Sequence, residues 1–149
     1  KVYATVGRKK LGVKLQVSSF EGFRTKKKFD VVVLKHVIEH VEDLNSFLVK
    51  CQKLLKTDGV LLISCPNIRS LMFYLFGSRW YGLQLGQHYW QFSPESLGKL
   101  LKKNGFKKVR RSVINLDYKV KGWKRPVFWF LLNFAKLTGL GDQLVVVAN

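Results

Sequence analysis

The sequence predicts an α/β fold whose sheet is mostly parallel, with an antiparallel last strand, and three observations lead to this prediction. Residues 29–34 and 60–65 are short apolar runs, rich in β-branched side chains, of the kind that form strands covered on both faces. Between them, apolar residues recur at helical spacing behind Asp43, a good N-cap residue. Strand, helix and strand in this order predict a βαβ unit with a right-handed crossover.

The amino-terminal part of the chain adds a helix and a further strand to the prediction. Residues 1–10 are basic and weakly helical, and Gly12 can end that helix. Residues 13–17 alternate apolar and polar side chains, which predicts a strand. Ser19 and Phe20 lie in the loop that follows, where a plain turn is the alternative to a binding role because Ser is a common turn former.

The segment after the first buried strand holds a group of ionisable side chains, namely Lys35, His36, Glu39 and His40. In a parallel sheet, ligands bind outside the carboxyl ends of the strands. We therefore expect function in this segment and at Asn67, which lies directly beyond the second strand. The alternative for Glu39 and His40 is structural, with both residues capping the next helix and orienting the loop.

The carboxyl-terminal half begins with an aromatic region. Residues 71–76 predict a short helix that is apolar nearly all round, and Trp80 extends this aromatic patch. Ser93 and Pro94 predict a sharp helix start, which makes His88 a fixed residue of the preceding loop. Because an imidazole titrates near neutral pH, His88 is a candidate general base or hydrogen-bond partner of a substrate, with a structural histidine as the alternative.

Three further elements complete the chain. Residues 106–114 predict a strand, and residues 141–148 predict the last one. Pro126 can start a helix between them, whose apolar face is wide enough to lie on a membrane although the apolar run is too short to cross one. Basic flanks favour anionic headgroups, so residues 119–137 are a candidate membrane-binding surface, with packing on the sheet or on a partner as the alternative.

Composition limits the classes of protein to which the chain can belong. Its 149 residues suffice for one domain with a real core, and 47% hydrophobic residues exclude a disordered tail. The 27 basic and 9 acidic residues give a net charge of +18, but this charge is spread along the chain, which argues for a solvated basic surface and against a nucleic-acid platform. Two cysteines without a CxxC pair argue against a cysteine zinc site and predict buried, reduced thiols in a cytoplasmic protein.

Several of these segments, taken in order, resemble a class I S-adenosylmethionine-dependent methyltransferase. The segments are residues 29–40, 54–59, 65–67, 87–97 and 104–106. The resemblance covers most of the chain from about Arg8, and it implies that residues 1–149 are the carboxyl-terminal part of a single domain, a partial Rossmann-like three-layer sandwich. An aromatic, lid-like insertion at about residues 68–92 and a basic and apolar helical insertion at about residues 119–140 interrupt it.

The resemblance also implies roles for the residues singled out above. S-adenosyl-L-methionine is the expected cofactor, and the expected cofactor-binding residues are Ser19, Phe20, Lys35 and His36. The residues expected to bind the substrate are Glu39, Asn67, Trp80 and Tyr89, and those expected to be catalytic are His40 and His88, with no metal ligand. The family's glycine-rich loop and its acidic residue for the ribose hydroxyls would precede Lys1, so we expect the chain to bind cofactor poorly and to be inactive without an amino-terminal segment.

The reaction that the resemblance implies is transfer of the sulfonium methyl group to a small-molecule acceptor, including an apolar or lipid-linked one, in the cytoplasm or peripherally at a membrane. Two alternatives from other classes stay open. The first is a non-catalytic basic module that binds an anionic membrane or a nucleic acid, which the net charge of +18 favours. The second is a zinc hydrolase, because His36, Glu39 and His40 fit a His-x-x-Glu-His pattern, although that motif needs a helix and His36 lies just past a strand.

Overall fold

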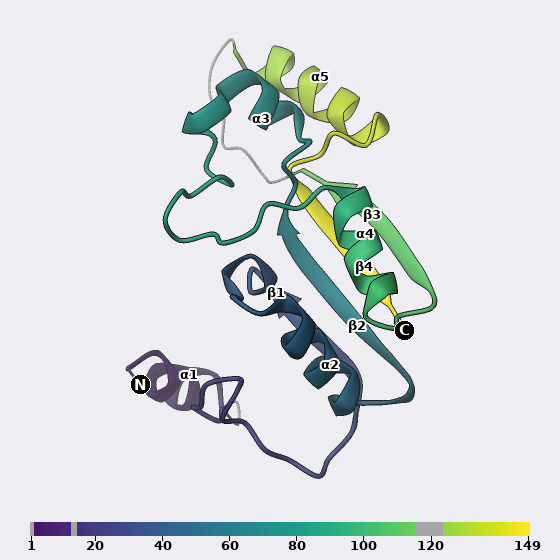
Figure 1. Cartoon of the computed structure of the whole chain (residues 1–149). Helices are drawn as coiled ribbons and strands as arrows, with labels where there is room; N and C mark the ends of the chain where they lie inside the picture. The colour runs from purple at the N-terminus through teal and green to yellow at the C-terminus, as the bar shows by residue number, and fades with distance from the viewer. Residues whose placement is uncertain (1, 13–14, 116–123) are drawn as a thin grey trace.

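The computed structural model describes residues 2–12, 15–115 and 124–149, which form a four-stranded sheet with helices around it (Figure 1). The strands are β1 (Phe29–Lys35), β2 (Leu55–Pro66), β3 (Val109–Ile114) and β4 (Gln143–Ala148). The α-helices are α1 (Val2–Leu11), α2 (Leu44–Leu54), α3 (Leu71–Phe76), α4 (Pro94–Lys103) and α5 (Lys124–Leu137), and two 3-10 turns are η1 (Ile38–His40) and η2 (Gly77–Arg79). All five predicted helices are confirmed.

The strand order is β1-β2-β4-β3, with β1 parallel to β2 and β4 antiparallel to both of its neighbours. Consequently β1, β2 and β3 run in the same direction, and only the last strand of the chain is reversed. This confirms the predicted fold class. It also brings the carboxyl ends of β1, β2 and β3 to one edge of the sheet, together with the start of β4.

The βαβ unit forms as its residue pattern predicts. The Asp43 carboxylate accepts hydrogen bonds from two backbone N–H groups of the first turn of α2, at 3.0 and 3.1 Å, and so caps this helix. β2 begins at Leu55, earlier than the predicted strand. Leu55 pairs with Phe29 and Val60 pairs with Val31, so the register between β1 and β2 shifts over residues 56–59. Gly59 allows a close approach there, since a Cβ at this position would lie 2.8 Å from the Phe29 carbonyl oxygen.

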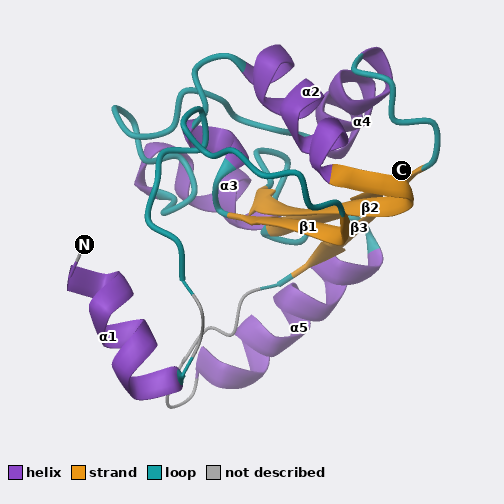
Figure 2. Ribbon diagram, turned by 90° about the horizontal axis from the view of Figure 1, so that it is seen from below, coloured by secondary structure: helices purple, strands orange, loops and turns teal. Residues whose placement is uncertain are grey.

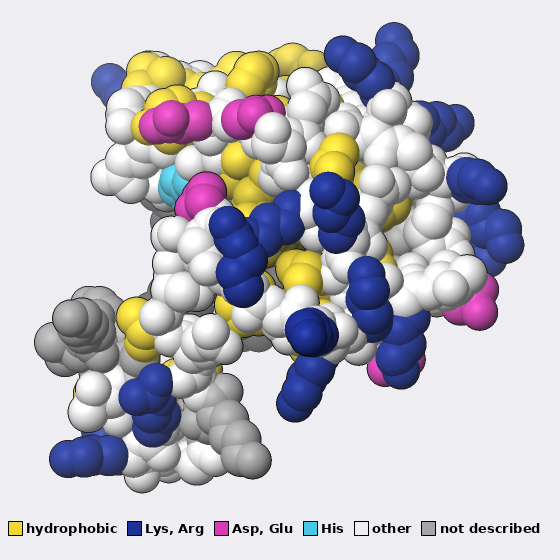
Figure 3. All heavy atoms as spheres, turned by 60° about the horizontal axis from the view of Figure 1, so that its bottom comes forward, with side chains coloured by type: hydrophobic (Ala, Val, Ile, Leu, Met, Phe, Trp, Pro, Cys, Tyr) yellow, Lys and Arg dark blue, Asp and Glu magenta, His cyan; other side chains and the backbone are white. Residues whose placement is uncertain are grey.

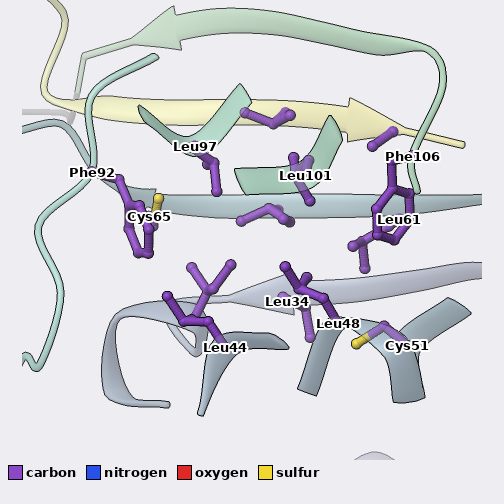
Figure 4. Packing of buried hydrophobic residues seen from close by; sticks show 14 of the residues in the cluster. Leu34, Leu44, Leu48, Cys51, Leu61, Cys65, Phe92, Leu97, Leu101 and Phe106 are labelled. Carbon is purple, nitrogen blue, oxygen red and sulfur yellow. The ribbon is translucent and has the colours of Figure 1, made fainter. Parts of the chain in front are cut away.

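One face of the sheet packs against α2 and α4 and forms the hydrophobic core (Figure 4). Apolar side chains at alternate strand positions point toward the two helices, as expected for a covered sheet. The core residues with no exposed surface are Ile38, Leu48, Cys51, Leu61, Ile63, Cys65, Leu97, Leu101, Leu144 and Val146. A core that joins both helices to the strands holds the loops at the carboxyl edge in fixed positions.

Neither cysteine is expected to react with a thiol reagent such as 5,5′-dithiobis(2-nitrobenzoate) while the protein is folded. Cys51 and Cys65 are buried and free, as predicted. Burial raises the pKa of Cys51 to about 12 and also raises the pKa of Cys65, so both thiols stay protonated near neutral pH. Absorbance at neutral pH should show no labelling in buffer and two equivalents in denaturant. Rapid labelling of the native protein would contradict the buried positions.

The helices lie on both sides of the sheet. Figure 2 shows α2 and α4 on one side of the sheet and α5 toward the other, and Figure 1 shows that α5 lies beyond the carboxyl edge of the strands. The side that faces α5 is less completely covered, because Val31 and Val33 of β1 are 49% and 59% exposed. Among the described residues β1 pairs with β2 alone, so β1 presents an open edge beside these two valines.

The strand predicted for residues 13–17 is wrong in the part that the structure describes. Gly12 follows α1 with a φ of 63°, so the predicted end of this helix is confirmed. Residues 15–17 have no regular secondary structure, and residues 13–14 lie outside the described residues. An alternating pattern forms a strand only where a neighbour takes up its backbone hydrogen bonds, and none of the described strands pairs with this segment.

Basic side chains are distributed over the surface of the molecule. Figure 3 shows Lys and Arg side chains at many separate places on one face, with fewer acidic ones between them. This agrees with the spread of charge along the sequence. None of the helices in the described ranges is long and apolar enough to span a bilayer.

Replacing Ser93 by alanine is expected to lower the free energy of unfolding by about 1 kcal/mol, because it removes the capping box of α4. The Ser93 hydroxyl accepts from the Ser96 N–H at 3.1 Å, and the Ser96 hydroxyl accepts from the Ser93 N–H at 2.9 Å. Urea unfolding followed by circular dichroism measures the change. Ser112→Ala, at an exposed position of β3, is the control, and equal effects of the two substitutions would argue against the cap.

Candidate functional site

The loops after β1 and β2 meet at one edge of the sheet, beside the start of β4. The backbone N–H of His36 donates to the Ser64 carbonyl oxygen at 2.8 Å, and that of Asn67 donates to the Asp142 carbonyl oxygen at 2.8 Å. His36 and Asn67 therefore lie at the same end of the sheet, as the βαβ interpretation requires. This edge is where ligands bind in open α/β sheets.

His36 is held in one orientation by groups on both sides of its ring. Its φ of 51° lies in the left-handed region, which is uncommon for a residue other than glycine. Its Nδ1 donates to Glu39 Oε1 at 3.0 Å, and its Nε2 accepts from Gln143 Nε2 at 2.9 Å. Gln143 Oε1 in turn accepts from the Ser64 hydroxyl at 3.2 Å. These hydrogen bonds assign the proton of the neutral His36 ring to Nδ1.

The structure does not give the His-x-x-Glu-His pattern the geometry of a zinc hydrolase. In that motif one turn of α-helix directs two imidazoles toward a single ion. Here Ile38–His40 is a single 3-10 turn. Both ring nitrogens of His36 are also engaged, by Glu39 and by Gln143, so His36 has no lone pair left for a metal that it would share with His40.

A different group, Glu39, His40 and His88, comes together at this edge and could hold a cation. One ligand atom from each residue lies within 4.8 Å of the others, and the two imidazole rings meet edge to face with centroids 4.7 Å apart. Nδ1 of His40 donates to the Gln87 carbonyl oxygen, and Nδ1 of His88 donates to that of Gly82, each at 2.9 Å. These contacts orient both rings and leave Nε2 of each as the ligand atom, which is the usual arrangement around a metal.

The Glu39 carboxylate is the member of this group that most needs a partner. Its side chain is 1% exposed, and Oε1 contacts His36 while Oε2 has no hydrogen-bond partner among the described residues. A buried carboxylate oxygen without a donor is unfavourable, and either a cation or a substrate proton would satisfy it. Two imidazoles and a carboxylate fit a transition metal such as Zn²⁺ or Mn²⁺. No metal ligand was predicted from the sequence, which does not show that His88 lies beside His40.

The aromatic insertion is attached to the loop after β1 by several polar contacts. The N–H groups of Tyr89 and Trp90 donate to the Glu39 carbonyl oxygen at 2.9 and 3.3 Å, and Trp90 Nε1 donates to the Val41 carbonyl oxygen at 2.7 Å. The Tyr89 hydroxyl donates to the Glu42 carboxylate at 2.9 Å, which raises the pKa of Tyr89. These contacts fix the end of the insertion against the site, and with it the loop that carries His88.

Asn67 and Trp80, both predicted to bind substrate, have structural contacts. Asn67 is buried, and its Nδ2 donates to the Gly141 carbonyl oxygen at 2.8 Å. Trp80 is buried too, with its ring edge to face against Phe73 and Tyr81 at centroid distances of 5.7 and 5.5 Å. Asn67 thus joins the start of the insertion to the segment before β4, while Trp80 packs within the insertion, and a role of either residue in substrate binding stays a prediction.

The predicted cofactor residues are distributed over two places. His36 is in the site described above, and Lys35 is exposed at the end of β1. The Phe20 ring packs against Phe47 with centroids 4.3 Å apart. The Ser19 hydroxyl accepts a hydrogen bond from the Gly22 N–H at 3.0 Å, as in the plain turn that was the alternative to a binding role. Their cofactor contacts stay predictions.

A groove of about 1180 Å³ runs between the loop before β1 and helix α2. Phe20 lies on one side of this groove, and His40 and Tyr89 lie at its end near the carboxyl edge of the sheet. The structure therefore brings one predicted cofactor residue, one predicted catalytic residue and one predicted substrate residue to the same surface depression.

Gln143 and Tyr81 belong to the site, but sequence reasoning missed them. Gln143 is buried and contacts His36, and the Tyr81 hydroxyl interacts with the Gln143 side chain. Burial raises the pKa of Tyr81 to about 12, so this hydroxyl stays protonated in the physiological range. A single amide at the start of an otherwise apolar last strand was the signal that could have identified Gln143.

Comparison with known families assigns the chain to one of them. Residues 4–111 match a family model described as a methyltransferase domain, which is more than half of the chain. The chain belongs to this family. The match includes β1, α2, β2 and the loops that carry Glu39, His40 and His88.

Relatives of this methyltransferase domain are named ubiquinone biosynthesis O-methyltransferases. The chain is 32% identical to that of Pelagibacter ubique over 123 residues, which cover 77% of this chain and 50% of the relative. It is 40% identical to the mitochondrial ubiquinone biosynthesis O-methyltransferase of Bos taurus over 83 residues, which cover 52% of this chain and 22% of the relative. The domain thus spans about half the length of the first relative and less of the second.

Solved structures of methyltransferases share the fold of this domain. An S-adenosylmethionine-dependent methyltransferase from Thermotoga maritima superposes with a TM-score of 0.71 at 18% identity, over 100% of this chain and 69% of that one. One from Clostridium acetobutylicum gives a TM-score of 0.62 at 12% identity, over 99% and 70% of the two chains. At these identities the likeness concerns the fold alone, and it supports the class I methyltransferase architecture.

Proposed function

We propose that this domain is part of an S-adenosylmethionine-dependent O-methyltransferase whose acceptor is a hydroxyl group on an apolar, ring-bearing small molecule. The observation on which the proposal rests most is the group of Glu39, His40 and His88, which can take up a hydroxyl proton or hold a cation at the ligand-binding edge. The names of the relatives support oxygen as the acceptor atom and an intermediate of ubiquinone biosynthesis as the acceptor. Exposed rings of Tyr89 and Trp90 next to this group suit an aromatic acceptor.

The proposed reaction is an in-line displacement at the methyl group of the sulfonium. The bond from acceptor oxygen to methyl carbon forms while the bond from carbon to sulfur breaks, which leaves S-adenosylhomocysteine, and the hydroxyl proton must go to a base. His88 can accept this proton on Nε2 because the Gly82 carbonyl oxygen holds its Nδ1–H. His40 is oriented in the same way by the Gln87 carbonyl oxygen and is the second candidate. The rest of the rate enhancement comes from positioning the two reactants.

A divalent cation is the second way in which the same group could make a hydroxyl more acidic. The unpartnered Oε2 of buried Glu39 favours this version, since a cation would compensate it. The two versions differ in their response to a chelator. Activity that survives extensive chelation supports the imidazole as base, whereas activity that is lost and restored by one divalent metal supports the cation.

We expect cofactor binding by this domain to need protein surface beyond the described residues. The glycine-rich turn that the family uses is not among the motifs of residues 1–149. The open edge of β1, with Val31 and Val33 exposed beside it, is a suitable place for another strand and its covering helix. We therefore expect an additional polypeptide segment to complete the cofactor site along β1.

A transfer assay with the full-length protein tests the proposal. The protein is incubated with methyl-labelled S-adenosylmethionine and a ring-hydroxylated acceptor that carries an apolar tail. Matched acceptors have the same ring with the hydroxyl replaced by hydrogen or by an amine. We expect label on the hydroxylated acceptor alone, and label on the amine, or on no acceptor although cofactor binds, would overturn the proposal.

The rival function is a basic module without catalysis, which the net charge of +18 favours. Such a module would bind an anionic membrane or a nucleic acid with an affinity that falls steeply as salt rises. Isothermal titration with S-adenosylmethionine separates the two functions. Absence of cofactor binding by the full-length protein, together with salt-sensitive binding to an anionic surface, would support the rival.

A further inference from the structure

We infer that α5 docks this domain on an anionic membrane surface through an apolar stripe on its outer side. The stripe consists of Val127, Phe130, Phe134 and Leu137, which are 58%, 65%, 47% and 88% exposed. Their spacing of three, four and three residues places them along one side of the helix. Trp129, 66% exposed, lies next to the stripe.

The inner side of α5 is already occupied, so the outer stripe is a second apolar surface of the same helix. Ala135 is 1% exposed, and Leu131 and Leu132 are half-buried. Asn115, just after β3, donates a hydrogen bond from Nδ2 to the Leu132 carbonyl oxygen and so attaches this side to the end of the sheet. A helix that is apolar on its packed side and on its outer side is typical of one that lies in an interface. Within the described part of the structure, each of the four stripe residues stays at least 47% exposed.

The charges around α5 determine which occupant fits the stripe. Residues 118–141 contain no acidic residue, and their basic residues are Lys119, Lys121, Lys124, Arg125 and Lys136. Residues 59–94, which include α3, contain Arg69 and Arg79 and also lack acidic residues, and Arg69 pairs with Glu95 just after them, at 3.4 Å. An exposed apolar stripe in a part of the sequence where basic residues outnumber acidic ones is complementary to acyl chains beneath anionic headgroups. An exposed tryptophan beside the stripe fits the same location, since indole rings concentrate at membrane interfaces.

The geometry of α5 suits a helix that lies flat. Its 14 residues extend over about 21 Å, and no described helix can span a bilayer. The Leu71 N–H at the start of α3 donates to the Leu140 carbonyl oxygen, just past α5, at 2.8 Å. Both helices lie beyond the carboxyl edge of the sheet (Figure 1). The candidate site is at this edge too, so docking through α5 would bring the site close to the lipid phase, from which an acceptor of the proposed apolar class would enter.

Vesicle binding by the full-length protein without cofactor tests this inference independently of methyl transfer. The vesicles consist of phosphatidylcholine alone or of phosphatidylcholine with phosphatidylglycerol. We expect cosedimentation with the anionic vesicles, and we expect Phe130→Ser with Phe134→Ser to weaken it by about tenfold or more. Leu15→Ser with Val17→Ser, which replaces two exposed apolar residues outside α5, is the matched control and should bind like the parent.

A second measurement decides the result if the double variant is unstable. Brominated lipids should quench the fluorescence of the parent protein more than that of Trp129→Phe, because Trp129 would lie at the boundary between headgroups and acyl chains. Equal quenching, or unchanged vesicle binding by the folded double variant, would overturn the inference. A lowered melting temperature of the double variant with unchanged vesicle binding would also overturn it, because it would show that another part of the protein covers the stripe.

Discussion

Replacing His88 by alanine is expected to lower turnover by about 10²- to 10⁴-fold, the range found when a positioned general base is removed. The imidazole is half-buried, its Nδ1 is fixed by the Gly82 carbonyl oxygen, and its ring meets that of His40. Cofactor affinity should change much less, because the described contacts of His88 are with its own loop and with His40. Steady-state kinetics of the full-length protein measure turnover, and isothermal titration with S-adenosylmethionine measures the affinity.

The control for this substitution is Tyr74→Ala, which removes an exposed ring from the same insertion and should leave both quantities unchanged. Unchanged turnover in the His88 variant would remove this residue from the catalytic group. An equal loss of turnover and of cofactor affinity would instead assign it a structural role in the loop.

Leu101→Ala is expected to lower the free energy of unfolding by about 2–5 kcal/mol, because it leaves a cavity in a well-packed core. Leu101 has no exposed surface and points from α4 toward the sheet (Figure 4). Urea denaturation of parent and variant measures the difference. Leu85→Ala, the same change at a position that is 78% exposed, should have little effect. A loss below about 1 kcal/mol for Leu101→Ala would show that the core is looser than the structure indicates.

Most of the fold could be predicted because local patterns and tertiary structure agree. The run from β1 to β2 combines apolar strands, a capped helix and helical spacing, and each of these signals depends on neighbours in the sequence. Ser93 and Pro94 likewise identify the start of α4. Residues 15–17 show the limit of this reasoning, since their alternation satisfies the strand pattern while no described strand supplies the hydrogen bonds.

The candidate site could be predicted only in part, because it is assembled from distant segments. Glu39 and His40 follow β1, where fold rules direct the search. The position of His88 beside them depends on the path of the aromatic insertion, for which no periodicity exists. Gln143 comes from the last strand, where a single amide in an apolar run singles out the residue but not its hydrogen-bond partner His36.

The border of β1, with which none of the described strands except β2 pairs, has a practical consequence for anyone who produces residues 1–149 by themselves. Bare strand borders flanked by valines are templates on which further copies can add, strand upon strand, into insoluble aggregates. Overproduction of this segment in bacteria should therefore give inclusion bodies unless a solubilising fusion shields that flank. A monodisperse, monomeric preparation, shown by light scattering, would mean that the border is masked in solution.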